Sequence, residues 1–467
     1  MGGFLVRTLI TNGHIVTATD DYMGDILIDG ETITALGAPG TFAALHTDVL
    51  LDAGDKYIFP GAIDVHTHME LPLPTTVASD DFETGTIAAA CGGTTTILDF
   101  ANQQRGHTLA DALQTWHAKA RGKAVIDYGF HMTITDLEAA PEAAMDEMIA
   151  EGVTSFKLLM AYPGTFMVDD DTIFRVLRRS AQLGGLVMVH AENGIVIDLL
   201  VRETVAAGNT APGFHALSRP AILEGEATQR VITLATLAQA PLYIVHVSCA
   251  PSLRAVASAR AQGLPVWGET CPQYLYLNDG VYAAPGFEGA KFVCTPPLRR
   301  IADNEALWLS LQRRELQVVS TDHAPFNFAG QKELGLHDFT KIPNGLPGVE
   351  HRVMLLYAGV RTGKLGLHHF VDLLATAPAR LFGLFPRKGT IASGSDADLV
   401  IFDPERPMTV SAATQHQRVD YTPYEGMQIK GVPDTVLLRG QVIVRDGEYI
   451  GGKGGGHYLR RKTFSEF

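Results

Sequence analysis

Eight short apolar runs alternate with helix-like segments through the middle of the 467-residue chain, and this alternation limits the possible folds more than any other feature. The strand candidates are residues 58–65, 94–100, 125–132, 153–160, 186–189, 242–247, 264–268 and 316–321. Helices are expected between several of them, at residues 108–122, 141–151, 171–183 and 225–238, each opened or closed by Gly, Asp or Pro. Eight strand-then-helix units predict an α/β fold with a (β/α)8 TIM-like barrel.

The two ends of the chain are expected to contain mainly short β-strands, unlike this middle part. Short strands are expected at residues 5–10, 15–17 and 25–28, with a turn at 11–14, and again at 397–402, 435–438 and 441–444. We therefore expect a second, small β-sandwich domain built from residues 1–57 and 388–467, with the barrel of residues 58–387 inserted between them. The Gly-rich segment 451–456 is expected to cross a surface or a subunit contact.

Composition excludes several classes of partner. The formal net charge of -14 argues against nucleic acid or an anionic membrane surface, and leaves a small molecule as the expected ligand. The four cysteines form no C-x-x-C pair, so neither a disulfide framework nor a zinc ribbon is expected. The first residues lack the features of a signal peptide and no apolar run is long enough to cross a membrane, which predicts a cytoplasmic protein.

His66 and His68 end the first expected barrel strand. Because positions i and i+2 of a strand face the same side, both imidazoles can reach one point and form half of a metal site. Asp64, two residues before His66, is expected to orient one of the two rings. Alone, the His-x-His pattern is equally compatible with polar residues at a strand end.

Residues of the types that bind metals recur in the later strands. Lys157 lies inside the fourth apolar run, His246 lies near the end of the sixth, and His190 and Asp322 directly follow the fifth and the eighth. In a barrel these positions converge on one mouth. A lone His there is commonly a hydrogen-bonded rim residue, and Asp322 could cap a helix.

Lys157 is the hardest of these residues to explain without a metal. A lysine facing a barrel core is costly unless it is paired or neutral. A neutral amine beside two cations can react with carbon dioxide, and the two oxygens of the resulting carbamate can bridge the cations. The set therefore predicts a two-metal centre with Lys157 modified to N6-carboxylysine.

Seven motifs along nearly the whole chain resemble those of the cyclic amidohydrolases, most closely the dihydropyrimidinase and hydantoinase (D-hydantoinase-like) branch. They are GAIDVHTH at residues 61–68, GGTTT at 92–96, SFK at 155–157, VHAENG at 189–194, VHVS at 245–248, PPLR at 296–299 and GTIASGSDADLV at 389–400. This resemblance implies that His66, His68 and Asp322 bind one zinc, that His190 and His246 bind a second, and that carboxylated Lys157 and a hydroxide bridge the two. Mn2+ or Co2+ could replace the zinc.

The resemblance also assigns the substrate residues. It implies that Tyr162 hydrogen-bonds the developing oxyanion and that the backbones of Thr295 and Asn344 hold a cyclic ureide. Many relatives have Ser where this chain has Thr295, whose methyl group is expected to narrow the pocket. Asp322 would pass a proton to the leaving nitrogen, and its neighbour His323, the competitor for that role, is expected to point to the opposite side.

The implied activity is a metal-dependent hydrolase. It opens the cyclic amide of hydantoins and 5,6-dihydropyrimidines to N-carbamoyl amino acids by attack of a dimetal-bridging hydroxide, and a homo-oligomer is expected, with a tetramer favoured over a dimer. The alternatives are an allantoinase, a dihydroorotase or another cyclic amidohydrolase. A non-enzymatic scaffold relative is disfavoured because such proteins have lost metal ligands, whereas every ligand position is filled here.

The loop after His68 leads to an expectation about substrates. Glu70 stands where dihydroorotase relatives place an arginine, so we expect a pocket that rejects carboxylate-bearing rings, with dihydroorotate at least about 100-fold worse than neutral rings in kcat/KM. An apolar wall for the substituent on ring carbon 5 is expected from Met69, Leu71, Leu73 and Phe166, all of which could equally be packing residues.

Overall fold

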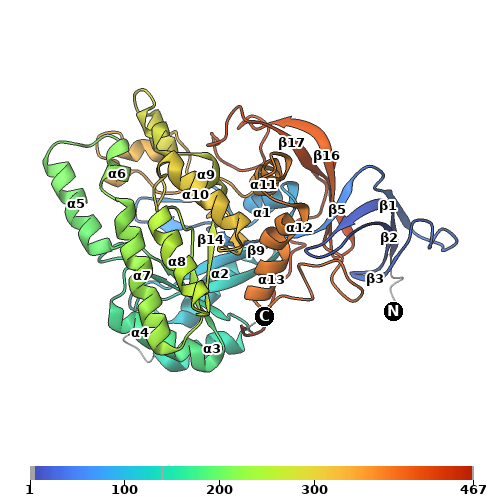
Figure 1. Ribbon diagram of the computed structural model, residues 1–467, viewed down its shortest axis with the longest axis horizontal. Helices are drawn as coiled ribbons and strands as arrows, with labels where there is room; N and C mark the ends of the chain where they lie inside the picture. Colours follow the sequence, from blue (N-terminus) through green and yellow to red (C-terminus); the bar gives the residue numbers. More distant parts are fainter. Residues whose placement is uncertain (1–5, 138–140, 465–467) are drawn as a thin grey trace.

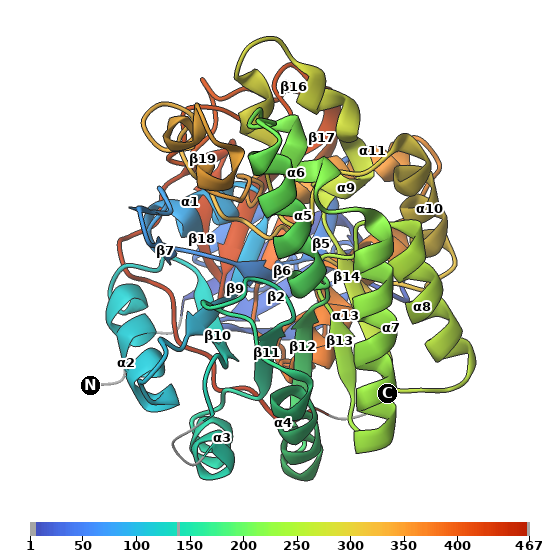
Figure 2. The same ribbon diagram turned by 90° about the vertical axis from the view of Figure 1, so that its left-hand side faces the viewer.

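The computed structural model describes residues 6–137 and 141–464. Eight parallel strands follow one another around a barrel in the order of the chain (Figures 1 and 2). They are β6 (Ala62–Thr67), β9 (Thr94–Asn102), β10 (Asp127–Thr133), β11 (Ser155–Leu159), β12 (Leu186–His190), β13 (Leu242–Ile244), β14 (Val266–Thr270) and β15 (Val318–Val319). The residues after β15 return to β6, where the His68 amide donates to the His323 carbonyl at 2.9 Å. The predicted (β/α)8 barrel is confirmed.

Helices cover the outside of the barrel, and Figure 2 shows α2, α3, α4, α7 and α8 around its strands. The helices are α1 (Thr84–Cys91), α2 (Leu109–Ala120), α3 (Pro141–Ala150), α4 (Asp170–Leu183), α5 (Gly194–Ala206), α6 (Gly213–Leu217), α7 (Ala221–Ala238), α8 (Ala250–Ala261), α9 (Pro272–Tyr276), α10 (Ile301–Gln312), α11 (Arg352–Arg361), α12 (Leu367–Val371) and α13 (Ala377–Leu381). Short 3-10 turns cover Asp279–Ala283, Glu288–Phe292, Lys332–Gly335 and Phe339–Lys341, and a π-turn covers Asp372–Thr376. Among the described residues, no helix combines the length and apolar character needed to cross a membrane.

Helix α4 illustrates why these segments are helical. Ile173, Val176 and Leu177 recur at helical spacing and are buried against the barrel. The Asp169 side chain accepts from the Thr172 amide at the N-terminus, and Gly184 ends the helix in the left-handed conformation. The predicted helix therefore forms one residue longer than expected.

Strands from both ends of the chain form a separate nine-stranded sheet beside the barrel (Figure 1). The strands are β1 (Arg7–Val16), β2 (Asp21–Asp29), β3 (Thr32–Gly37), β4 (Val49–Asp52), β5 (Tyr57–Pro60), β16 (Leu399–Thr409), β17 (Gln428–Leu438), β18 (Gln441–Arg445) and β19 (Glu448–Tyr449). The two ends meet at β5, which pairs with β1 on one side and β16 on the other. The prediction of a second β-domain built from both termini is confirmed; its boundaries stay a prediction.

Two local predictions about strands were wrong. The apolar run at 58–65 is not one strand, because β5 belongs to the terminal sheet and β6 to the barrel, with Gly61 between them. A Cβ at Gly61 would lie 2.1 Å from Thr95 Oγ1, so only glycine fits this crossing. The turn expected at 11–14 is instead a bulge inside the continuous strand β1, with Asn12 at φ 59°. Leu5, the first residue of the expected strand 5–10, lies outside the described residues.

The Gly-rich segment 451–456 crosses the surface of its own barrel. The Gly456 amide donates to the Ala124 carbonyl at 2.9 Å, and a Cβ at Gly456 would lie 1.9 Å from the Ile126 carbonyl oxygen. The chain then continues along the barrel, where the Leu459 amide donates to the Tyr128 carbonyl. Glycine is required here because the tail lies directly on barrel backbone.

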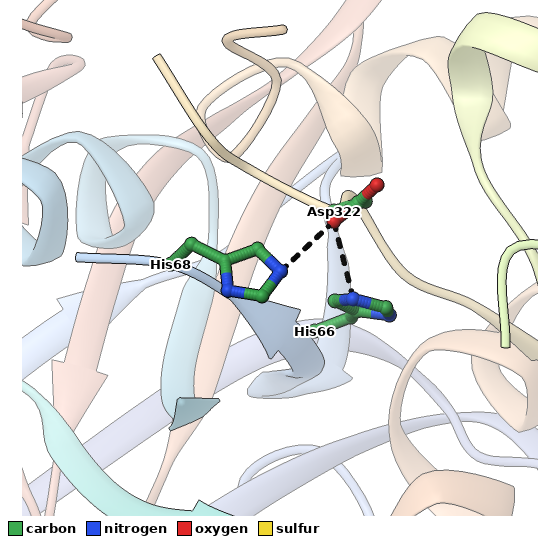
Figure 3. Close-up of side chains that lie close together, drawn as sticks. All are labelled: His66, His68 and Asp322. Atoms are coloured by element: carbon green, nitrogen blue, oxygen red, sulfur yellow. Dashed lines mark ion pairs between the residues drawn. The ribbon is translucent and has the colours of Figure 1, made fainter. Parts of the chain in front are cut away.

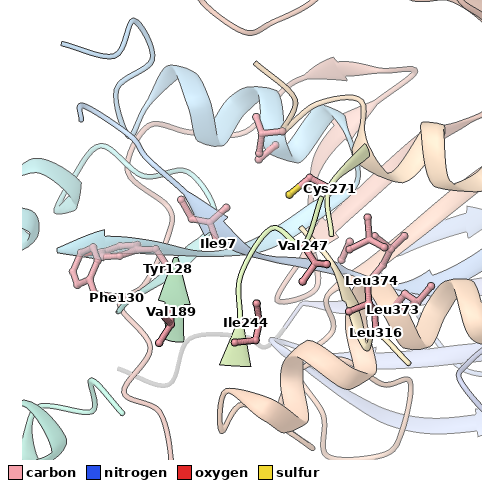
Figure 4. Close-up of a cluster of buried hydrophobic side chains, with 14 of the residues drawn as sticks. Ile97, Tyr128, Phe130, Val189, Ile244, Val247, Cys271, Leu316, Leu373 and Leu374 are labelled. Atoms are coloured by element: carbon pink, nitrogen blue, oxygen red, sulfur yellow. The ribbon is translucent and has the colours of Figure 1, made fainter. Parts of the chain in front are cut away.

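The alternation of side chains along the strands positions the functional residues. In β11, Phe156 and Leu158 join the large apolar cluster between strands and helices, to which Ile97, Val189 and Ile244 also belong (Figure 4). Lys157, between them in sequence, therefore faces the opposite way, and its Nζ lies 5.0 Å from the centre of the Phe100 ring. A charged side chain is thus directed into the barrel by its register alone.

Candidate metal centre

Three side chains from the first strand of the barrel and from the segment after its eighth strand meet at the barrel mouth (Figure 3). The Nε2 atoms of His66 and His68 each lie 3.1 Å from Oδ1 of Asp322. Within residues 6–137 and 141–464, these three form the one group of three or more His, Cys, Asp or Glu side chains arranged to hold a metal ion. The site exists because the residues after β15 close the barrel against β6, although the two segments are far apart in sequence.

His190 and His246 form a second pair of donors next to this group. Nδ1 of His190 faces Nε2 of His246 at 2.9 Å, and both side chains are buried. His66 joins the two groups, since its ring centre lies 5.4 Å from that of His246. Facing ring nitrogens with convergent lone pairs fit a shared cation, because imidazole is a common metal ligand.

Lys157 completes the set from the side of β11. Its side chain is only 4 % exposed, and no hydrogen bond reaches its Nζ from the described residues. Burial lowers the pKa of Lys157 to about 8, against the attraction of Glu269 and Asp322. A buried, readily deprotonated amine among imidazoles and a carboxylate fits a pair of divalent cations, and it is the form that a carbamate requires.

Two buried carboxylates that the sequence analysis missed orient the histidines. Glu269 lies near the end of β14. Its carboxylate contacts Nδ1 of His66 and accepts a hydrogen bond from the Tyr243 hydroxyl at 3.0 Å. Burial lowers the pKa of His66, but the carboxylates of Asp322 and Glu269 outweigh it and raise the pKa to about 9. The signal was present, because Glu269 directly follows the seventh apolar run, as His190 follows the fifth.

Glu192 is the second of these carboxylates. Its Oε2 lies 2.8 Å from Nε2 of His190 and 3.6 Å from a guanidinium nitrogen of Arg219. Burial raises the pKa of Glu192, but the hydrogen bond to His190 and the charge of Arg219 outweigh it and lower the pKa to about 2. Glu192 therefore holds His190 with Nδ1 turned toward His246.

The role expected of Asp64 was wrong. Its carboxylate accepts from the His66 backbone amide at 3.2 Å and from the Thr321 hydroxyl at 2.6 Å, and touches neither imidazole. Asp64 thus ties the backbone of β6 to that of the eighth strand, while Glu269 orients the His66 ring.

His323 points away from Asp322. Its Nε2 lies 3.0 Å from Oδ2 of Asp80, and its Nδ1 accepts from the Gly348 amide. The side chain is fully buried in these contacts. Asp322 therefore faces the metal ligands, and His323 is part of the packing behind it.

The three expected substrate residues come together beside the second histidine pair. The Tyr162 ring centre lies 5.7 Å from that of His190, and the side chains of Thr295 and Asn344 lie near enough to the Tyr162 hydroxyl to lower its pKa. Burial raises the pKa of Tyr162, so its hydroxyl keeps its proton and can donate it in a hydrogen bond.

The structure separates the four residues of the expected apolar wall. Leu71 and Leu73 are half-buried against Ala324 and Phe326, and Phe166 lies edge-on to Tyr162 with ring centres 6.3 Å apart. Met69 is fully buried in the core, where a Cβ at Gly85 would lie 2.3 Å from its sulfur. Met69 therefore fits the alternative of a packing residue, and its place in a substrate wall stays a prediction.

Glu70, which stands where dihydroorotase relatives place an arginine, contacts two lysines of its own chain. Its Oε1 lies 3.1 Å from Nζ of Lys123, and Lys119 donates to its backbone carbonyl at 2.9 Å. No arginine occupies this position, so the expected rejection of carboxylate-bearing rings stays a prediction.

Comparisons with known proteins agree with this arrangement. The model of the amidohydrolase family matches residues 57–212 and 292–443. D-hydantoinases of Streptomyces coelicolor and Geobacillus stearothermophilus are 52 % and 51 % identical to the chain, over 98 % of its length and 98 % and 97 % of theirs. The crystal structure of dihydropyrimidinase from Brevibacillus agri superposes with a TM-score of 0.97 at 51 % identity, covering 99 % of this chain and 100 % of that one. The chain therefore belongs to the amidohydrolase family and, within it, to the hydantoinase and dihydropyrimidinase branch.

Proposed function

We propose that this metal-dependent hydrolase opens the cyclic amide of hydantoins and 5,6-dihydropyrimidines to give N-carbamoyl amino acids. The observation that carries the proposal is the meeting of four histidines, Asp322 and Lys157 next to the Tyr162 hydroxyl. The relatives named D-hydantoinase and dihydropyrimidinase match this chain over nearly its whole length, which favours the same substrate class.

The proposed cofactors are two Zn2+ ions, with Mn2+ or Co2+ as substitutes. His66, His68 and Asp322 would hold one ion, His190 and His246 the other, and N6-carboxylated Lys157 both. Two bound cations lower the pKa of a shared water and supply a hydroxide at neutral pH. The mixed nitrogen and oxygen donors suit zinc.

The substrate is held and polarised by residues of this chain. We assign the backbone groups of Thr295 and Asn344 to the cyclic ureide, as the resemblance implies. The Tyr162 hydroxyl, which burial keeps protonated, would donate to the carbonyl oxygen as that oxygen gains charge. One well-placed donor of this kind contributes about 3 to 4 kcal/mol to lowering the barrier.

Asp322 is assigned the proton transfer. Both neighbouring histidines face its Oδ1, which leaves Oδ2 to take the proton from the attacking water. The same atom would return the proton to the ring nitrogen as the carbon–nitrogen bond breaks, so that the leaving group departs as a neutral amide nitrogen.

The alternative functions differ from the proposed one in the substrate that the pocket accepts or in having no enzymatic activity. Allantoinase and dihydroorotase would use the same metals on other rings, whereas a scaffold protein would show no turnover. Purified protein loaded with zinc should convert dihydrouracil and 5-substituted hydantoins to products one water heavier, and chelation should abolish this. No turnover of either substrate by protein that holds both metals would refute the proposal.

The proposal also includes a cytoplasmic homo-oligomer, with a tetramer favoured over a dimer, as the resemblance implies. Light scattering on the eluting protein should return the mass of four chains. A mass of one chain at micromolar concentration would contradict this part alone.

A further inference from the structure

Lys332 is a buried lysine that the mechanism above does not use. Of the lysines in the described residues, Lys157, Lys332 and Lys388 are buried, and each has a different environment. Lys388 contacts three carboxylates, whereas no hydrogen bond reaches Lys157. Lys332 contacts three backbone carbonyls and forms no ion pair with the described residues. Its position in the chain, in a 3-10 turn after the eighth strand, carries no motif for metal binding.

The three carbonyls belong to the two segments assigned to the substrate. Lys332 Nζ donates to Val293 at 2.8 Å, to Gly345 at 2.8 Å and to Pro343 at 3.0 Å. Val293 comes two residues before Thr295, while Pro343 and Gly345 flank Asn344. The Gly345 amide also donates to the Val293 carbonyl at 3.1 Å, so the ammonium lies where the two segments join.

Only a protonated lysine can donate a hydrogen bond to each of these three carbonyls. Three carbonyl oxygens require three N–H donors, which an ammonium has and a neutral amine or a side-chain amide lacks. Burial lowers the pKa of Lys332 to about 7. Against this effect, the three carbonyl contacts are fully satisfied only by the charged form. Burying an ammonium here instead of an apolar side chain is costly, and what it secures is the relative position of the two segments.

The segment around Asn344 is fixed on its other side by the metal-bearing strand end. Gly345 has φ 146°, and a Cβ there would lie 2.4 Å from the Ala324 carbonyl, two residues after Asp322. Thr295 and Asn344 also lie near the Tyr162 hydroxyl. Lys332 thus contacts the two segments that contain Thr295 and Asn344, the residues whose backbones would face the substrate.

We propose that Lys332 is a positioning residue for substrate: its ammonium fixes the backbones of Thr295 and Asn344 and thereby sets the affinity for the cyclic ureide. The inference rests on the substrate class and the roles given under Proposed function. Because these backbone contacts hold the ring in both the ground state and the transition state, their loss should raise KM and leave kcat nearly unchanged.

The test compares two lysine variants of the zinc-loaded enzyme. Lys332→Met keeps the length and apolar stem but removes all three donors, and should raise KM at least about tenfold with kcat within about threefold. The matched control Lys388→Met removes a buried lysine far from the site and should lower Tm without changing KM. Both variants should keep two metals per chain.

A second variant keeps the test decisive where Lys332→Met does not fold. Lys332→Gln retains two donors on a shorter chain and should give an intermediate KM. A KM within about twofold of wild type in either folded variant, or a loss of kcat and metal in place of the KM change, would overturn the proposal. Failure of the wild type to hydrolyse hydantoin or dihydrouracil would instead refute the proposed function, and the variants would then be compared on the cyclic amide that it does hydrolyse.

Discussion

Three residues of the site have a backbone conformation that residues other than glycine rarely adopt. Tyr162, His246 and Asp322 have φ of 67°, 38° and 54°. Such strain costs on the order of 1 to 3 kcal/mol per residue and persists only where the surroundings enforce it. Each of the three follows a barrel strand, so the left-handed turn directs the side chain over the mouth. Apolar periodicity carries no signal for such turns, and the sequence could therefore predict which residues meet but not how they are aimed.

Lys157 supports a direct prediction at this scale. Lys157→Ala should lose most of its metal and activity, because no other described side chain can replace the bridging anion proposed here. Short carboxylic acids such as acetate or propionate should restore part of the activity by occupying the space of the carbamate. Metal analysis and kcat with and without the acid provide the measurement. Full metal content and kcat in the alanine variant would show that Lys157 has no such role.

Asp322 and His323 provide a matched pair of variants. Asp322→Asn should lower kcat at least about 100-fold even where metal is retained, because the amide cannot take up the proton. His323→Asn should mainly lower Tm, since His323 is buried against Asp80 and the Gly348 amide. Steady-state kinetics and thermal unfolding separate the two effects. The assignment would be reversed if the histidine variant lost kcat and the aspartate variant kept it.

At the scale of elements, two strands are shorter than their apolar runs. The run at 242–247 forms only the strand Leu242–Ile244, and the run at 316–321 only Val318–Val319. Each strand ends two or three residues before a functional residue that has left the extended conformation, His246 or Asp322. The order and type of the barrel elements were predictable from the alternation of apolar runs with helix-like segments. The residues at which these two strands end were not predictable from it. Similarly, β14 carries no proposed metal ligand but supplies Glu269, which only the folded barrel brings to His66.

The orienting role of Glu269 is testable. Glu269→Gln should weaken metal affinity about 10- to 100-fold, because the amide no longer supplies the charge that holds the His66 ring and binds the Tyr243 hydroxyl. Titration of the metal-free variant with zinc measures this affinity, with Tyr243→Phe as a control that keeps the carboxylate. An unchanged affinity in Glu269→Gln would show that β14 is only structural.

At the scale of the whole molecule, a buried cluster of charges joins the barrel to the terminal sheet. Lys388 lies 2.6 Å from Asp127 of β10 and 2.6 Å from Asp398, which precedes β16. Arg439, after β17, contacts Asp127 and donates to the Gly455 carbonyl in the tail. The two-domain arrangement was predictable from the β-rich ends. This junction was not predictable, because Asp127 lies hundreds of residues from Lys388 and Arg439. In the sequence each of these residues looks like an ordinary charged residue.

Lys388→Met should therefore destabilise the protein by about 3 to 5 kcal/mol, since it leaves buried carboxylates without a counter-charge. Denaturant unfolding measures the loss, and kcat of the folded variant should stay at the wild-type value because the cluster lies away from the metal centre. A change below about 1 kcal/mol would show that the junction is held mainly by apolar packing and the tail.

The central claim is the hydrolysis of neutral cyclic ureides, and the ratio of kcat/KM for dihydrouracil to that for dihydroorotate tests it most directly. Both rings undergo the same amide opening, but dihydroorotate adds a carboxylate for which position 70, a glutamate paired with Lys123, provides no arginine. The structure and its relatives predict a ratio of at least about 100, with N-carbamoyl-β-alanine as the product of dihydrouracil. Comparable kcat/KM values for the two rings, or turnover of dihydroorotate alone, would contradict the account.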